Sequence, residues 1–160
     1  MLPSNNSRTN SKPHVLVIDD SEIARSHMAG LLSDADFVVF EQPSAIGATR
    51  AIRENAIQAV VVDVSMPGLS GDKLVGVLRK NQRLEGLVIV VVTGKTSDEV
   101  SSLAELEAAD EVLFKDGLNQ TLVRALSRLL RTSSYRPSGE STSNAPEEIA
   151  RTSGSIRRQR

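Results

Sequence analysis

Five short runs of β-branched and other apolar residues recur along the chain, separated by segments with helical periodicity. Within each run, apolar residues follow one another without polar alternation, which is typical of strands covered on both faces, as in a parallel sheet. The runs span residues 14–18, 37–40, 59–62, 87–92 and 112–114. Right-handed crossovers place the intervening helices on both faces of such a sheet. We therefore predict a doubly wound five-stranded α/β domain.

The intervening segments carry apolar stripes and capping residues that are typical of helices. A first stripe comprises Ile23, His27, Met28, Leu31 and Leu32, and a second comprises Leu118, Leu122, Ala125, Leu126 and Leu129. Helix starts are expected at Ser44, Ser70 and Thr96, and Thr96 with Glu99 fits a capping box. After the third run, Pro67 and Gly68 predict a loop.

Composition changes sharply on either side of this pattern. Residues 1–12 and 132–160 are rich in polar residues and poor in residues that can pack, so we predict two disordered tails around a domain at 13–131. Each tail carries a net charge of +2, which leaves −5 on the central region of a chain whose total is −1. The predicted C-terminal tail contains Ser, Thr and Arg but too little apolar surface for an output domain.

Several classes of function are disfavoured by the composition. The chain has no Cys, which excludes disulfides, thiol nucleophiles and Cys-ligated metals. The acidic central region and the four aromatic residues argue against nucleic-acid binding. The longest apolar run, at 87–92, is too short to cross a membrane. We therefore expect a cytoplasmic protein that binds neither nucleic acid nor membrane.

Charged and hydroxyl side chains stand where four of the predicted strands end. Asp19 and Asp20 follow the first strand, Asp63 the third, Thr93 the fourth and Lys115 the fifth. Because the carboxyl ends of parallel strands form one edge of the sheet, these side chains are expected to share a cleft. Three close carboxylates repel one another, and Mg²⁺ relieves that repulsion. A carboxylate beside Mg²⁺ can attack phosphorus and form an aspartyl phosphate.

Each of these residues also has an ordinary structural explanation when taken alone. An acidic pair before a helix can cap it, an Asp can simply end a strand, a Thr can bond to the backbone, and a lone Lys is usually solvated. His14 and His27 are best explained as satisfied or partly exposed side chains rather than as phosphotransfer or metal-binding residues. The combination at four strand ends is what favours a functional site.

Four segments resemble the receiver domain of two-component response regulators. They are VLVIDDSEIAR at 15–25, VVVDVSMPGLSG at 60–71, VVVTGK at 90–95 and VLFKD at 112–116. The resemblance covers nearly all of residues 13–131 and implies a flavodoxin-like sheet with strand order 2-1-3-4-5. It also implies a phosphoacceptor that assists its own phosphorylation and dephosphorylation, rather than an enzyme acting on other molecules.

The resemblance assigns a role to each of the strand-end residues. Asp63 matches the phosphoacceptor, and Thr93 and Lys115 match the hydroxyl and the ammonium that contact the phosphoryl group. Asp19, Asp20, Asp63 and the backbone carbonyl of Ser65 match the Mg²⁺ ligands. Gly94 matches a position where a small residue leaves access to the phosphate.

The chain departs from the family pattern at two positions on and after the fifth strand. Asp116 stands where the family usually has Pro, and Val112 stands where many members carry an aromatic residue that turns inward on activation. These departures put in doubt how phosphorylation is transmitted to the surface. Lys95, two residues after Thr93, matches a position bordering the route of the hydrolytic water. It is either a regulator of phosphoryl lifetime or a solvated residue at a helix start.

We therefore expect a single-domain response regulator. It would receive a phosphoryl group on Asp63 from a histidine kinase or phosphotransfer protein and switch a surface made by the fourth helix, fifth strand and fifth helix for a protein target. The alternative is an interaction module that works without phosphorylation. A hydrolase with Asp63 as nucleophile is less favoured, because the D-x-D-x-T signature of dehalogenase-like phosphatases is missing.

Overall fold

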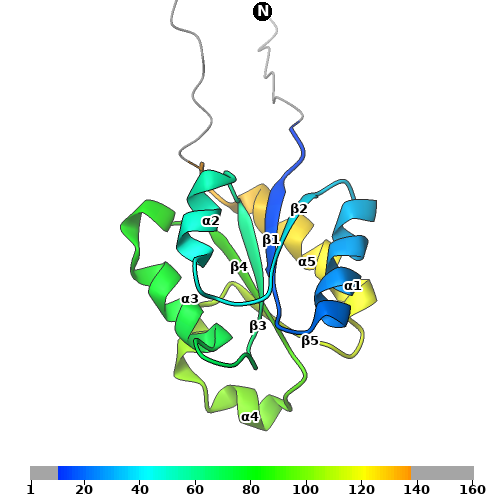
Figure 1. Cartoon of the computed structure of the whole chain (residues 1–160), viewed down its shortest axis with the longest axis vertical. Coiled ribbons are helices and arrows are strands. Elements are labelled where there is room, and N and C mark those ends of the chain that lie inside the picture. The colour runs from blue at the N-terminus through cyan, green and yellow to red at the C-terminus, as the bar shows by residue number, and fades with distance from the viewer. Residues whose placement is uncertain (1–10, 138–160) are drawn as a thin grey trace, which may run out of the picture.

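The computed structural model describes residues 11–137, which form a central parallel sheet with helices on both faces (Figure 1). The order of the five strands is β2-β1-β3-β4-β5, so the predicted doubly wound, flavodoxin-like fold is confirmed. The strands are β1 (His14–Ile18), β2 (Val38–Gln42), β3 (Ala59–Asp63), β4 (Val88–Thr93) and β5 (Glu111–Phe114).

The helices divide between the two faces of the sheet, α1 and α5 on one and α2 and α3 on the other (Figure 1). The helical elements are α1 (Glu22–Asp34), α2 (Ala48–Glu54), α3 (Gly71–Lys80), α4 (Ser97–Ser101) and α5 (Leu118–Thr132), with the 3₁₀ turns η1 (Gln82–Leu84) and η2 (Ala104–Ala108). No helix among them is both long and apolar enough to cross a bilayer, within the residues described.

Two layers of buried side chains hold the helices to the sheet. Alternate residues of each central strand point to opposite faces, so Val61 packs with the α1–α5 layer and Val62 with the α2–α3 layer. Both are fully buried, as are most residues of β1, β3 and β4. Each such side chain contributes about 1.5–3 kcal/mol to folding. This burial explains why the runs lack polar alternation.

The helix predictions hold in part. The capping box of Thr96 and Glu99 is confirmed at the start of α4. Ser70 precedes α3, but its side chain makes no capping hydrogen bond. The prediction for Ser44 is wrong, because α2 begins only after Gly47, whose φ is 82°. The helix starts late since Gly47 adopts the left-handed conformation that glycine tolerates best.

The apolar stripe predicted for the first helix is also wrong for two of its residues, Ile23 and His27. Ile23 is 85% exposed, and His27 is exposed and forms a hydrogen bond of 2.6 Å with Asn119 of α5. The buried face of α1 is instead Met28, Ala29 and Leu32. The α1 stripe is narrower than predicted, whereas the second stripe packs as expected, with Leu122 and Leu126 fully buried.

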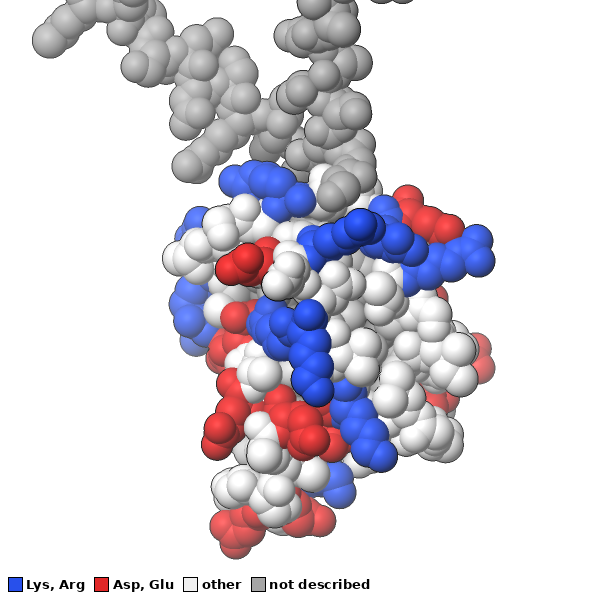
Figure 2. All heavy atoms as spheres, turned by 90° about the vertical axis from the view of Figure 1, so that its left-hand side faces the viewer, with Lys and Arg blue, Asp and Glu red and all other residues white. Residues whose placement is uncertain are grey.

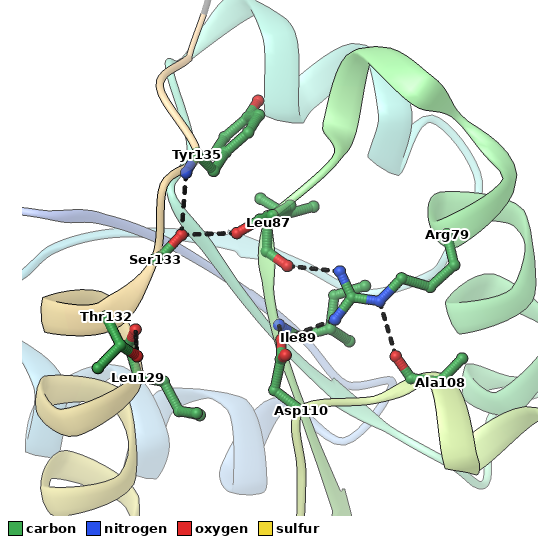
Figure 3. Close-up of polar contacts among 10 residues, drawn as sticks. Arg79, Leu87, Ile89, Ala108, Asp110, Leu129, Thr132, Ser133 and Tyr135 are labelled. Carbon is green, nitrogen blue, oxygen red and sulfur yellow. Dashed lines mark hydrogen bonds and ion pairs between the residues drawn. The ribbon is translucent and has the colours of Figure 1, made fainter.

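Packing continues beyond residue 131, where we predicted the domain to end. Tyr135 is only 7% exposed and belongs to the α2–α3 core layer. Ser133 donates to the carbonyl of Gly86 at 2.6 Å and accepts from the Tyr135 amide at 3.1 Å (Figure 3). Residues up to Tyr135 therefore pack against the domain, and the boundary at 131 stays a prediction. The rest of the predicted tails, residues 1–10 and 138–160, lies outside the described residues.

Arg79 of α3 forms hydrogen bonds at the end of the sheet where β4 and β5 begin (Figure 3). Its guanidinium donates to the carbonyls of Ala108 at 2.7 Å and Leu87 at 2.6 Å, and it pairs with the Asp110 carboxylate at 2.7 Å. That carboxylate also accepts from the amide of Ile89 at 2.7 Å. These hydrogen bonds fix the starts of β4 and β5. They lie at the opposite end of the sheet from the residues that follow the strands.

Candidate functional site

The strand order brings five predicted site residues, at four strand ends, to one edge of the sheet. Asp63 is the last residue of β3 and Thr93 the last residue of β4, and these two strands pair directly. Asp19 and Asp20 directly follow β1, which pairs with β3 on its other side, and Lys115 directly follows β5. Since all strands run parallel, these ends meet beside α4 at the lower edge of the view in Figure 1.

Three carboxylates form a compact cluster at this edge. Asp19, Asp20 and Asp63 each offer an oxygen, and these oxygens all lie within 4.8 Å of one another. Asp19 and Asp63 are buried, whereas Asp20 is exposed. A set of carboxylate oxygens open to solvent on one side is the donor set that Mg²⁺ prefers. The acidic pocket thus fits both Mg²⁺ and phosphorylation.

Lys115 is the cation that faces this cluster. Its Nζ lies 3.3 Å from Asp19 Oδ2 and 3.3 Å from Asp63 Oδ1. Burial alone would lower the pKa of Lys115, but the two carboxylates together outweigh burial and leave this pKa above its ordinary value. Lys115 therefore stays charged at neutral pH.

The pKa of the Asp63 carboxyl group is shifted by its surroundings. Burial raises the pKa of Asp63, the ammonium of Lys115 lowers it, and the neighbouring carboxylates of Asp19 and Asp20 raise it again, with a net increase. Asp63 is thus harder to ionise than an exposed Asp, and a bound cation would offset this cost. Raised pKa values of this origin are common at functional sites.

Thr93 contributes a buried hydroxyl at the same edge. Its side chain is 1% exposed, and its Oγ1 accepts a hydrogen bond of 3.0 Å from the amide of Lys95. Its backbone carbonyl accepts from the Lys115 amide at 2.8 Å. The hydroxyl proton of Thr93 is not used in the contact with Lys95, so it can be donated to a ligand.

The other residues singled out from the sequence belong to the same strands or follow them. Ser65 is exposed and stands two residues after Asp63, and its carbonyl as a metal ligand stays a prediction. Gly94 follows Thr93, and a Cβ built there would come no closer than 3.9 Å to Lys115. Val112 packs partly buried against the α2–α3 layer, and Asp116 is exposed.

Three supporting residues were not identified from the sequence. The amide of Ser21 donates to Asp19 Oδ1 at 2.9 Å, and Arg25 Nη1 donates to the Asp19 carbonyl at 2.7 Å. A Cβ on Gly71 would lie 2.1 Å from the carbonyl oxygen of Asp63, so only glycine fits where α3 begins. Of these, only Gly71 had a sequence signal, namely a glycine directly after a possible helix cap.

Comparison with known proteins agrees with this geometry. Residues 15–127 match the family described as the response regulator receiver domain. The two-component response regulator PhoP of Pseudomonas aeruginosa is 31% identical over 120 residues, which is 75% of this chain and 52% of PhoP. The chain thus spans about half the length of that relative. The two-component response regulator ORR5 of Oryza sativa is 28% identical over 121 residues, or 74% of this chain and 90% of ORR5.

Solved structures show the same architecture. The response regulator TrrA of Thermotoga maritima, determined in complex with Mg²⁺ and BeF, superposes with a TM-score of 0.66 at 25% identity. The match covers 73% of this chain and 98% of TrrA. With the family match spanning residues 15–127, the chain belongs to the receiver domains of response regulators, which work in two-component signalling.

Proposed function

We propose that Asp63 accepts a phosphoryl group from a histidine kinase or a histidine phosphotransfer protein. The observation that carries this proposal is the meeting of three carboxylates and one ammonium at a single sheet edge, with Lys115 Nζ 3.3 Å from Asp63 Oδ1. A buried carboxylate facing a fixed cation suits attack on a negatively charged phosphoryl group, because the cation offsets charge that builds up on the transferred oxygens.

Asp19, Asp20 and Asp63, with the backbone carbonyl of Ser65, would hold Mg²⁺. When bound, the metal ion supplies the positive charge that neutralises the cluster and the phosphoryl oxygens. The all-oxygen donor set supports this assignment. So does the raised pKa of Asp63, whose largest cause is burial, because a carboxylate that resists ionisation gains from a cation close by.

In the transfer step, a carboxylate oxygen of Asp63 attacks phosphorus while the bond between phosphorus and the donor imidazole nitrogen breaks. The imidazole leaves with the bonding electron pair, and the product is an aspartyl phosphate. Lys115 and the hydroxyl of Thr93 each contact a phosphoryl oxygen. Attack by water on the same phosphorus returns the carboxylate and releases phosphate. The chain thus acts as a phosphoacceptor that assists its own phosphorylation and dephosphorylation.

Phosphorylation would switch a protein-binding surface made by α4, β5 and α5. The modification adds a charge of about −1.5 to −2, which attracts the Lys115 ammonium and the Thr93 hydroxyl. Thr93 directly precedes the loop to α4, and α4 contains no buried residue. A helix with so little packing moves at small energetic cost. This favours α4 as the element that responds.

We infer that the protein works as a single-domain regulator in the cytoplasm, with protein partners and without contact to nucleic acid or membrane. The acidic charge of residues 13–131 supports this, because phosphate backbones and anionic lipid surfaces repel a negative domain. The match to ORR5 covers 90% of that response regulator, which supports the single-domain proposal.

The second candidate is an interaction module that works without phosphorylation. Val112 favours it, because a partly buried valine packed against the α2–α3 layer has no ring to turn inward. Asp116 favours it as well, since under this hypothesis the exposed carboxylate that directly follows Lys115 would draw its ammonium away from the cluster. Under this hypothesis partner affinity is the same whether or not Asp63 carries phosphate.

Incubation with phosphoramidate separates the two candidates. In the presence of Mg²⁺, intact-mass spectrometry should show one added phosphoryl group on the wild type and none on Asp63→Asn. The matched control is Asp34→Asn, at the exposed end of α1, which should be labelled like the wild type. Equal labelling of wild type and Asp63→Asn, or no labelling of either, would contradict phosphotransfer and leave the interaction module.

A further inference from the structure

A cavity lies at the opposite end of the sheet from the acidic cluster. It has a volume of about 310 Å³ and is lined by Arg53, Arg83, Leu84 and Tyr135. Arg53 comes from the last turn of α2, Arg83 and Leu84 from η1, and Tyr135 from the segment after α5. Leu84 and Tyr135 are 2% and 7% exposed, so they form a buried apolar floor of the cavity. The guanidinium groups of Arg53 and Arg83 are exposed.

The charges of this cavity are not balanced by the protein within residues 11–137. Neither Arg53 nor Arg83 has a carboxylate partner within 4.0 Å in that part of the chain, whereas the nearby Arg50 and Arg79 are paired at 2.7 Å with Glu54 and Asp110. Two guanidinium groups at one cavity repel each other, and an anion between them relieves that repulsion. The planar fork of Arg suits phosphate and carboxylate groups in particular.

Two further features fit an anionic ligand. The phenol of Tyr135, like that of any tyrosine, is protonated at neutral pH, and burial raises its pKa further, so it can donate a hydrogen bond. Figure 2 shows Lys and Arg side chains over the upper and middle parts of the face that it draws, with some Asp and Glu among them, while most Asp and Glu lie in the lower half. An anion is therefore attracted to the upper end of the face and repelled from the lower end.

We propose that this cavity binds a compact polyanion, a small molecule with two or more phosphate or carboxylate groups. Its volume is at the lower end of the range of small-molecule pockets, which suits such a ligand better than a whole nucleotide cofactor. Arg53 and Arg83 each bind one anionic group, and Leu84 and Tyr135 form the floor. The site is separate from the acidic cluster and does not depend on Mg²⁺.

Calorimetric titration of the full chain in a buffer freed of divalent metals on a chelating resin, without soluble chelator, tests this site, with pyrophosphate and citrate as separate probes. We expect one binding site per chain, and an affinity at least about tenfold lower in Arg53→Gln and in Arg83→Gln, since each loses a charge-assisted contact. Arg50→Gln, on the same helix but already paired, is the matched control and should bind like the wild type, as should Asp63→Asn.

The two probes distinguish the kinds of anion. Tighter binding of pyrophosphate assigns the cavity to phosphorylated ligands, and tighter binding of citrate assigns it to carboxylates. Circular dichroism of each variant checks that the fold is retained, and Arg53→Lys should keep part of the affinity because it keeps the charge. Binding of neither probe, or equal binding by wild type, Arg53→Gln and Arg83→Gln, would overturn the proposal.

Discussion

Lys115 Nζ lies 3.3 Å from Asp63 Oδ1, although the lysine follows β5 and the aspartate ends β3. The same ammonium lies 3.3 Å from Asp19 Oδ2, so one cation serves two buried carboxylates. It therefore neutralises neither carboxylate fully, which agrees with the net increase in the pKa of Asp63, caused first by burial. The carboxylates of the site therefore carry more negative charge than Lys115 neutralises, and this excess favours binding of a metal ion.

Replacing Lys115 with Met should raise the pKa of Asp63 further. The ammonium is the main influence that lowers this pKa against the effect of burial, and Met keeps much of the side-chain volume without the charge. Titration of the ¹³C carboxyl signal of Asp63 in metal-free buffer measures the change. Lys80→Met, at the other end of α3, should leave the titration as it is. A pKa of Asp63 that is the same in Lys115→Met and wild type would contradict this account.

Asp63→Asn should stabilise the metal-free protein, and increasingly so as the pH rises. The folded state holds the Asp63 proton to a higher pH than the unfolded chain, whose value is near 3.8. From about that pH upward the unfolded state therefore releases its proton first, and this group lowers the free energy of unfolding until the folded pKa is passed. Asn has no such titration, so the variant should be more stable than the wild type at neutral pH.

Urea unfolding at several pH values without metal measures this difference in stability between Asp63→Asn and wild type. The difference should be smallest near pH 4 and largest above the folded pKa of Asp63. Saturating Mg²⁺ should reduce or reverse it, because the wild type gains binding energy that the variant loses. A difference that stays constant over the whole pH range would show that burial and charge repulsion at Asp63 are not its cause.

Gly71→Ala should destabilise the fold and disturb the site at the same time. The new methyl group would lie 2.1 Å from the Asp63 carbonyl oxygen, so either α3 or the end of β3 has to shift. We expect a loss of about 1–3 kcal/mol in unfolding free energy. Gly30→Ala is the matched control, since nothing lies within 4 Å of its Cβ and helix α1 should gain about 0.5–1 kcal/mol. Similar stability changes in both variants would contradict the close approach.

A feature of this architecture can be predicted from the sequence when the residues that determine it lie close together in the chain. The strands are predicted well because burial on both faces requires continuous apolar runs, and the residues after them follow from the strand ends. The prediction that Ile23 belongs to the buried face of α1 fails because this residue lies in the first turn of the helix, beyond the surface that the sheet covers. Helical periodicity gives the direction of a face but not its width.

The missed features depend on contacts between distant segments. Tyr135 is buried because Ser133 is bonded to the Gly86 carbonyl, which is 47 positions away. The polar composition of residues 132–160 hides this contact. Arg25 likewise supports the site through the Asp19 carbonyl, and no spacing in the sequence indicates that a solvent-side Arg will turn inward. Such interactions become visible only once the topology is known.

Lys95→Ala should speed the hydrolysis of the aspartyl phosphate. The Lys95 amide donates to Thr93 Oγ1 at 3.0 Å, which holds this residue next to the proposed phosphoryl site. A cation at this position screens the phosphoryl group from the approaching water, so its loss should raise the rate about fivefold, equivalent to roughly 1 kcal/mol. Loss of label over time measures the rate, with Lys73→Ala on the exposed side of α3 as control. An unchanged rate would show that Lys95 is merely solvated.

The central claim is that Asp19, Asp20, Asp63, Thr93 and Lys115 form one metal-dependent phosphate pocket. Binding of beryllium fluoride, followed by ¹⁹F NMR during a titration with Mg²⁺, tests it most directly. The account predicts a bound signal only with Mg²⁺ in the wild type, at least about tenfold more Mg²⁺ needed in Asp20→Asn, and no bound signal in Asp63→Asn. A bound signal in the presence of EDTA, or one that persists in Asp63→Asn, would contradict it.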